Sequence, residues 1–177
     1  VYKKSDAIIV LTYSFKEEII SRGIDNDKVF VIRNGVELSP YSNRRGEKDI
    51  KHEHSIRNNK KVIGYVGSLG AAQGLLNVVN TAKILEKEHA DVLFMFVGEG
   101  DEKEKIVRAA QGLKNVIFVG SQPRASIPAY LFSFYIGLAH LNDNLVFGKN
   151  IPSKIFDMMA AGLPVLLVAP KGEASQI

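Results

Sequence analysis

Residues 62–97 read VIGYVGSLGAAQGLLNVVNTAKILEKEHADVLFMFV: an apolar run, a glycine-rich turn, an amphipathic segment and a second apolar run. The apolar runs, 62–66 and 92–97, are typical of strands buried on both faces of a sheet. Residues 75–89 have the apolar spacing of a helix with one buried face. That face would carry Leu75, Val78, Val79, Ala82 and Leu85. A strand, a helix and a strand in this order predict two parallel strands joined by a right-handed crossover.

The same alternation extends in both directions along the chain. We predict further strands over 8–11, 29–32, 116–119, 136–141 and 165–168. We predict further helices over 13–22, 101–111, 125–132 and 152–161. The pattern indicates an α/β fold with a Rossmann-like parallel sheet flanked by helices. Ligands of such sheets bind at the carboxyl ends of the strands, so the loops after Val66, Val97, Val119 and Leu141 should converge on one cleft.

Composition excludes several classes of site. The chain has 177 residues and no cysteine, which excludes disulfides, zinc–thiolate sites and thiol catalysis. No apolar run reaches the roughly 18 residues of a membrane-spanning helix.

The net charge of +4 comes from residues 42–61, and the rest of the chain is balanced, which argues against a nucleic-acid-binding face. We predict a basic loop over 39–61, either solvated or attracted to an acidic membrane surface.

Residues 151–165, IPSKIFDMMAAGLPV, predict a helix that begins at a proline and leads into a buried strand. Lys154 falls in the first turn of this helix, where the dipole disfavours a cation unless an anion lies beside it. Helix N-termini also bind phosphate groups. We therefore predict a phosphate site of a nucleotide sugar. Lys154 and Asp157 are also spaced for a surface ion pair, and this alternative stays open.

Several motifs, taken in order, carry a family resemblance. Residues 31–37 (VIRNGVE), 64–75 (GYVGSLGAAQGL), 96–100 (FVGEG), 116–120 (VIFVG) and the 151–165 segment resemble the C-terminal, donor-binding domain of retaining glycosyltransferases of the GT-B fold, family 4. The final motif is similar to the form found in O-antigen and capsule polysaccharide synthesis. The resemblance implies a cytoplasmic retaining hexosyltransferase, either free or peripheral to the inner face of the membrane.

The resemblance also implies a domain organisation. Residues 1–38 would be the tail of an N-terminal acceptor domain and the interdomain linker, followed by the basic loop over 39–61. Residues 62–177 would be the donor-binding domain, truncated at its C-terminus. This is one half of a two-domain GT-B architecture, so we expect part of the catalytic residues in the missing N-terminal domain. The isolated chain should bind donor weakly and catalyse nothing.

The implied reaction moves a sugar from a UDP- or GDP-linked donor to a lipid-linked or glycan acceptor, with no metal and no cofactor. Such a site must stabilise the negative charge of the departing diphosphate. The expected partners are the donor, the acceptor and the missing domain, with no nucleic acid. The resemblance places the donor-binding residues at Gly67, Ser68, Gln73, Glu99, Ser121, Gln122, Lys149, Lys154 and Asp157.

Four of these positions depart from the family pattern. Ser68 and Gln73 stand where members typically have Arg and Lys, so we expect Lys154 to supply the cation. Asp157 stands where a glutamate usually accepts hydrogen bonds from the ribose. Lys149 replaces an acid that contacts the transferred sugar, so it is expected to line the sugar or phosphate site instead.

Other functions stay open. A non-catalytic nucleotide- or sugar-binding module would explain the lost charges, and sugar-nucleotide epimerases share the fold. Half of an NAD-dependent oxidoreductase fits less well, because Gly64, Gly67 and Gly70 do not form Gly-x-Gly-x-x-Gly and Glu99 lies too far along the chain. A P-loop NTPase is excluded, because the sequence has no Gly-Lys-Ser/Thr.

Overall fold

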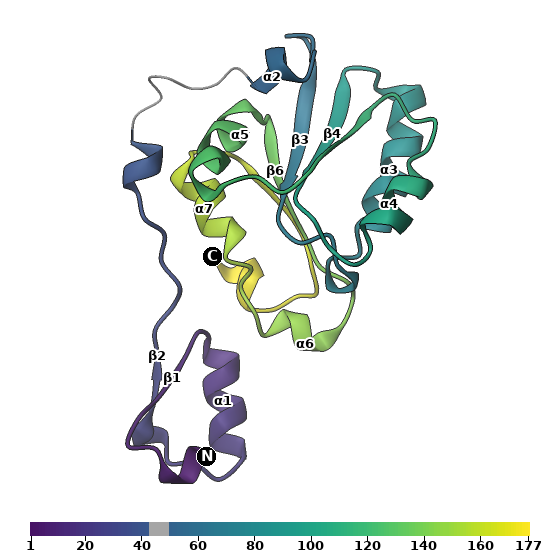
Figure 1. Ribbon diagram of the computed structural model, residues 1–177. Coiled ribbons are helices and arrows are strands. Elements are labelled where there is room, and N and C mark those ends of the chain that lie inside the picture. Colours follow the sequence, from purple (N-terminus) through teal and green to yellow (C-terminus); the bar gives the residue numbers. More distant parts are fainter. Residues whose placement is uncertain (43–49) are drawn as a thin grey trace.

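The computed structural model describes residues 1–42 and 50–177 and contains two parallel sheets (Figure 1). The larger sheet has five strands in the order β5-β4-β3-β6-β7, and every neighbouring pair is parallel. The bounds are β3 Lys61–Val66, β4 Val92–Val97, β5 Val116–Val119, β6 Ile136–His140 and β7 Val165–Val168. The predicted Rossmann-like α/β fold is confirmed.

Helices cover both faces of this sheet. α3 (Leu75–Glu88) and α4 (Lys103–Ala109) lie on one face, and α5 (Ile127–Ser133) and α7 (Lys154–Ala160) lie on the other (Figure 1). Side chains alternate along β4, so Leu93, Met95 and Val97 join one buried cluster and Phe94 and Phe96 the other. This two-sided burial explains the continuous apolar run in the sequence. Within the described residues, no helix is both long and apolar enough to cross a bilayer.

Two short helices lie in segments that we predicted as loops. α2 (Ile50–Glu53) falls inside the predicted basic loop, where Ile50 and Ile56 are buried in the same cluster as Tyr41. Charged residues flank these two isoleucines in the sequence, so their burial could not be predicted from the local apolar pattern. Residues 43–49, with Arg44, Arg45 and Lys48, lie outside the described residues. α6 (Leu145–Gly148) falls in the predicted polar loop over 142–150, and the Asn144 side chain caps it.

The N-terminal residues form a small βαβ unit of their own. β1 (Ile8–Val10) pairs in parallel with β2 (Val29–Val31), and α1 (Tyr13–Ser21) connects them. The core of this N-terminal unit consists of Ile8, Ile19, Ile24 and Val29. On the side of the strands away from this core, Ile9 and Phe30 are neighbours and more than half exposed.

The N-terminal unit is joined to the larger one by polar contacts. Thr12 Oγ1 donates to the carbonyl of Lys149 at 2.8 Å. The Ser14 amide and hydroxyl both donate to Glu173 Oε1, at 2.6 and 2.9 Å. Glu173 is only 5 % exposed, and it lies at the start of α1, where free N–H groups attract an anion. Glu173, near the C-terminal end of the chain, therefore caps α1, which lies near the N-terminal end.

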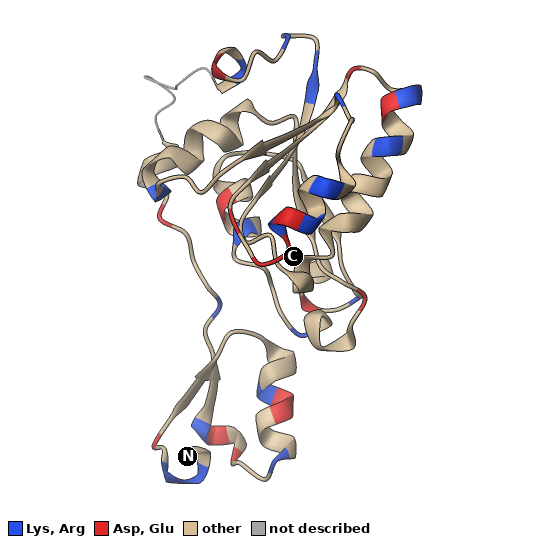
Figure 2. Cartoon of the chain, turned by 45° about the vertical axis from the view of Figure 1, so that its right-hand side comes forward, with Lys and Arg blue, Asp and Glu red and all other residues tan. Residues whose placement is uncertain are grey.

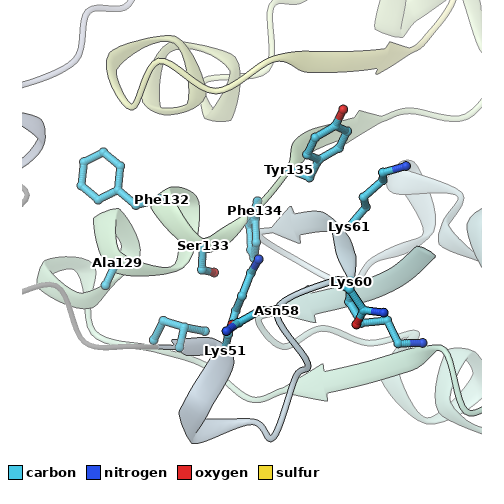
Figure 3. Close-up of a pocket in the computed structure, with 11 residues that line it drawn as sticks. Lys51, Asn58, Lys60, Lys61, Ala129, Phe132, Ser133, Phe134 and Tyr135 are labelled. Atoms are coloured by element: carbon cyan, nitrogen blue, oxygen red, sulfur yellow. The ribbon is translucent and has the colours of Figure 1, made fainter. Parts of the chain in front are cut away.

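Both acidic and basic residues lie on α3 and α4 (Figure 2), and ion pairs join Lys105 to Glu102 and Arg108 to Glu104. A cavity of about 560 Å³ lies between α2 and α5 at the amino ends of the strands (Figure 3). Of its lysines, Lys61 pairs with Asp91 at 3.0 Å and Lys60 donates to the Ala90 carbonyl. This end of the sheet is opposite to the edge where ligands of parallel sheets bind.

Replacing Glu173 with alanine should loosen the junction, because the partly buried Ser14 amide loses its acceptor. The free energy of local opening at this amide, measured by native-state hydrogen exchange, should fall by about 1–3 kcal/mol. Glu17→Ala, an exposed change on the same helix, is the matched control and should alter it by less than about 0.5 kcal/mol. Equal effects of the two substitutions would contradict the capping role.

Candidate functional site

Two glycine turns meet at the carboxyl edge of the larger sheet. Gly67 follows β3 with a φ of +140°, and Gly98 follows β4 with a φ of +142°. A Cβ atom on Gly98 would overlap the carbonyl oxygen of Gly67. Only glycine permits these angles and this approach, so the two turns leave the backbone accessible at the edge of the sheet.

Two adjoining cavities open at these turns and share Val66, Gly67, Ser68 and Ile127 as walls. The first, about 270 Å³, lies between the β3 turn and the start of α7, and its lining includes Gly67, Ser68, Gln73, Arg124, Lys154 and Asp157. The second, about 280 Å³, extends toward β4 and β5, and its lining includes Glu99, Ser121 and Gln122. We call the two together the carboxyl-edge recess.

The recess brings together all the predicted site residues except Lys149. The Lys149 ammonium donates to Glu18 of α1 at 2.8 Å, and its side chain lines neither cavity. The loops after β3, β4 and β5 converge as expected. The loop after Leu141 does not line the recess; the Asn142 amide donates to the Ala72 carbonyl at 2.9 Å, so this loop packs against the residues before α3.

Lys154, the first residue of α7, places its ammonium 3.7 Å from the centre of the Tyr65 ring. The same ammonium lies under Gly67, where a Cβ atom would approach it to 2.8 Å. Within residues 1–42 and 50–177, no carboxylate forms an ion pair with it. Burial lowers the pKa of Lys154 to about 7, because the charged form loses hydration. The predicted alternative, an ion pair between Lys154 and Asp157, is not formed.

Asp157 has two other partners that the sequence did not reveal. Its Oδ1 accepts from Arg124 Nη2 and from the Tyr41 hydroxyl, each at 2.7 Å, and its Oδ2 accepts from Arg124 Nη1 at 3.3 Å. The Arg124 side chain is 75 % exposed but binds the carboxylate in a bidentate manner. Burial, followed by the nearby carboxylate, raises the pKa of Tyr41.

The remaining polar groups support or border the recess. The Tyr65 hydroxyl donates to the Ser68 carbonyl at 2.6 Å, and burial raises its pKa. His140 Nδ1 lies 2.7 Å from the Gln73 carbonyl. Glu99 pairs with Lys103 at 2.5 Å on the rim. Since Arg124 and Asp157 neutralise each other, the inner recess is positively charged when Lys154 is protonated, which suits an anionic ligand.

Over the part of the chain that the structure describes, no three His, Cys, Asp or Glu side chains come close enough to hold a metal ion.

Comparison with known proteins gives concordant relatives. The family model "Glycosyl transferases group 1" matches residues 46–177. The "Putative colanic acid biosynthesis glycosyl transferase WcaI" of Escherichia coli (strain K12) is 28 % identical over 171 residues, which cover 93 % of this chain and 40 % of that protein. The "Probable glycosyltransferase WbjE" of Pseudomonas aeruginosa is 30 % identical over 121 residues, 67 % of this chain and 30 % of that protein. The chain thus spans less than half the length of either relative.

Solved structures share the fold. Anabaena Alr3699/HepE, crystallised with UDP and glucose, superposes with a TM-score of 0.79 at 18 % identity, covering 99 % of this chain and 47 % of that one. WaaG, a glycosyltransferase involved in lipopolysaccharide biosynthesis, gives a TM-score of 0.74 at 16 % identity, covering 95 % of this chain and 50 % of that one. With a family match over more than half its length and the Rossmann-like fold of its GT-B neighbours, the chain belongs to the group 1 glycosyl transferases.

Proposed function

We propose that the chain supplies the donor-binding half of a metal-independent, retaining glycosyltransferase. The donor would be a UDP- or GDP-linked hexose, and the acceptor a lipid-linked or glycan molecule. The observation that carries this proposal is the Lys154 ammonium, which lies in the carboxyl-edge recess beside the Gly67 turn with no carboxylate partner among the described residues. That HepE was solved with UDP and with UDP-glucose supports a nucleotide-sugar donor.

In this proposal, Lys154 binds the diphosphate. The leaving group gains negative charge as the sugar departs, and a cation with little competing water stabilises that charge strongly. Ser68 and Gln73 line the same cavity and add hydrogen bonds but no charge. The chain's own contribution to catalysis is therefore one fixed cation and the accessible backbone of two glycine turns.

Asp157 would bind the ribose, and the second cavity would receive the base. The Oδ2 atom of Asp157 accepts only one long hydrogen bond, so it retains capacity to accept from a ribose hydroxyl. Ser121 and Gln122, on the loop after β5, and Glu99, after β4, line the neighbouring cavity. Lys149 has no part in this scheme, because its ammonium is paired with Glu18.

The rest of the enzyme would lie outside this chain. We assign residues 1–38 to the tail of an acceptor domain and the linker, and residues 62–177 to the donor domain. The exposed apolar pair Ile9 and Phe30 supports contact between the N-terminal unit and further protein. We also propose a cytoplasmic enzyme at or near the inner face of the membrane.

Calorimetric titration of the chain with UDP, GDP, ADP and NAD in EDTA tests the proposal. We expect saturable binding of UDP or GDP without metal, and no sugar transfer by this chain alone. Binding of NAD alone would contradict the proposal, as would turnover by the isolated chain. If the full-length protein bound none of the nucleoside diphosphates, the proposal would be wrong.

Replacing Lys154 with methionine should weaken binding of UDP, or of GDP if GDP is the nucleotide bound, by about 10- to 100-fold, because a charge-assisted contact is worth roughly 1.5–3 kcal/mol. The affinity for the corresponding nucleoside should change by less than about twofold, since it lacks the diphosphate. Lys83→Met, at an exposed position of α3, is the matched control. Equal losses for nucleotide and nucleoside would contradict the assignment of Lys154 to the diphosphate.

Donor affinity should also fall as pH rises from 7 to 9. Free Lys154 loses its proton near pH 7, and a bound diphosphate restores it, so binding takes up a proton. A UDP-sugar is the suitable probe, because its diphosphate diester lacks the phosphate ionisation near pH 6. Calorimetry in buffers of different ionisation enthalpy measures the uptake. Lys154→Arg stays charged and should remove the slope.

The same pKa shift affects the ligand-free fold. The folded-state pKa lies below the ordinary lysine value of 10.5, so the unfolded chain holds this proton more tightly. The cost of burying Lys154 is therefore complete below pH 7 and fades as pH rises toward 10.5. For the donor prediction above, a UDP-sugar affinity that stays constant from pH 7 to 9 would contradict the role of Lys154 in diphosphate binding.

A further inference from the structure

We propose that Tyr41 is a positioning residue that orients Asp157 for the ligand's ribose, so that a residue of the linker controls nucleotide affinity. Tyr41 closes the short helical turn Ser39–Tyr41, which lies between the N-terminal unit and the larger sheet. The inference rests on the proposed function, because it takes Asp157 as the ribose acceptor.

The phenol ring of Tyr41 is fixed by its surroundings. The side chain is buried, and its ring meets the Phe132 ring of α5 edge-on, with centroids 6.3 Å apart. Ile50 and Ile56 belong to the same buried cluster. A phenol packed in this way has little rotational freedom, so its hydroxyl is a fixed donor aimed at Asp157 Oδ1, 2.7 Å away.

The two oxygens of Asp157 are not equally occupied. Oδ1 accepts from both Tyr41 and Arg124 at 2.7 Å, whereas Oδ2 receives only the 3.3 Å bond from Arg124. A carboxylate has about four acceptor positions, so the free ones are concentrated on Oδ2. With Oδ1 held on the linker side, Oδ2 is the oxygen left for a ligand in the cavity that Asp157 lines.

Arg124 cannot hold this orientation alone. Its side chain is 75 % exposed and has many rotamers, and a guanidinium can grip a rotated carboxylate equally well. The Tyr41 hydroxyl selects one orientation of the carboxylate, because it donates from a buried ring to Oδ1 only. Withdrawal of the linker from α5 would therefore free Asp157 to rotate and lower the affinity for a ribose.

The test is Tyr41→Phe in the full chain, which removes the hydroxyl and keeps the ring packed on Phe132. Titration should show about 3- to 10-fold weaker binding of UDP, or of GDP if GDP is the nucleotide bound. Its 2′,3′-dideoxy analogue, which has no ribose hydroxyls, should bind with less than about twofold change. Tyr135→Phe, at a half-exposed tyrosine at the other end of the sheet, is the control and should change neither affinity.

A double-mutant cycle with Asp157→Ala completes the test. In the Asp157→Ala background, Tyr41→Phe should have no further effect on nucleotide affinity. Equal losses for the nucleotide and its dideoxy analogue, an additive loss in that background, or unchanged nucleotide affinity would each overturn the proposal for Tyr41. A full-length wild-type protein that binds neither nucleoside diphosphate would overturn the proposed function itself, so the two failures are distinguishable.

Discussion

Burial of the Lys154 ammonium destabilises the folded protein, and the groups that surround it in the recess offset this penalty only in part. Removing a cation from water costs several kcal/mol unless another group replaces its hydration. The face of Tyr65 replaces part of it, at roughly 0.5–2 kcal/mol, and the lowered pKa shows that the rest is not recovered. Tyr65 is itself held by its bond to the Ser68 carbonyl and by a row of rings on neighbouring strands. Tyr65 lies 6.2 Å from Phe96, and Phe96 stacks on Phe118 at 5.2 Å.

This row links the fold to the site. Tyr65, Phe96 and Phe118 are register partners on β3, β4 and β5, so the parallel pairing brings their rings together near the carboxyl ends of the strands. The turns that follow the same strands form the walls of the recess. The strand register that brings these aromatic rings together therefore also positions the two glycine turns. The Lys154 ammonium, which has no carboxylate partner among the described residues, lies beside the first of these turns.

Much of this arrangement could be predicted from the sequence, because strands and helices follow from local apolar spacing. The convergence of Gly67, Glu99 and Ser121 follows from parallel topology alone. Local patterns gave no signal for the Tyr41–Asp157 bond, which joins residues 116 positions apart. Arg124 has no acidic neighbour in the nearby sequence, and only the fold brings the Asp157 carboxylate beside it. For Lys149 the sequence was misleading. Its position in a family motif predicted a role in the site, but its ammonium binds Glu18 of α1 instead.

The position of α7 explains why the N-terminal unit matters to the recess. One connection runs through the linker, where Tyr41 reaches Asp157. Another runs through the segment before α7, where Lys149 contacts Thr12 and Glu18 of the N-terminal unit. Only a few residues separate Lys149 from Lys154, so both of these connections lead to α7, whereas the Ser14–Glu173 bonds join α1 to the segment after β7. A different placement of α1 would therefore also affect the segment that carries Lys154 and Asp157, the two charged residues of α7 that line the recess.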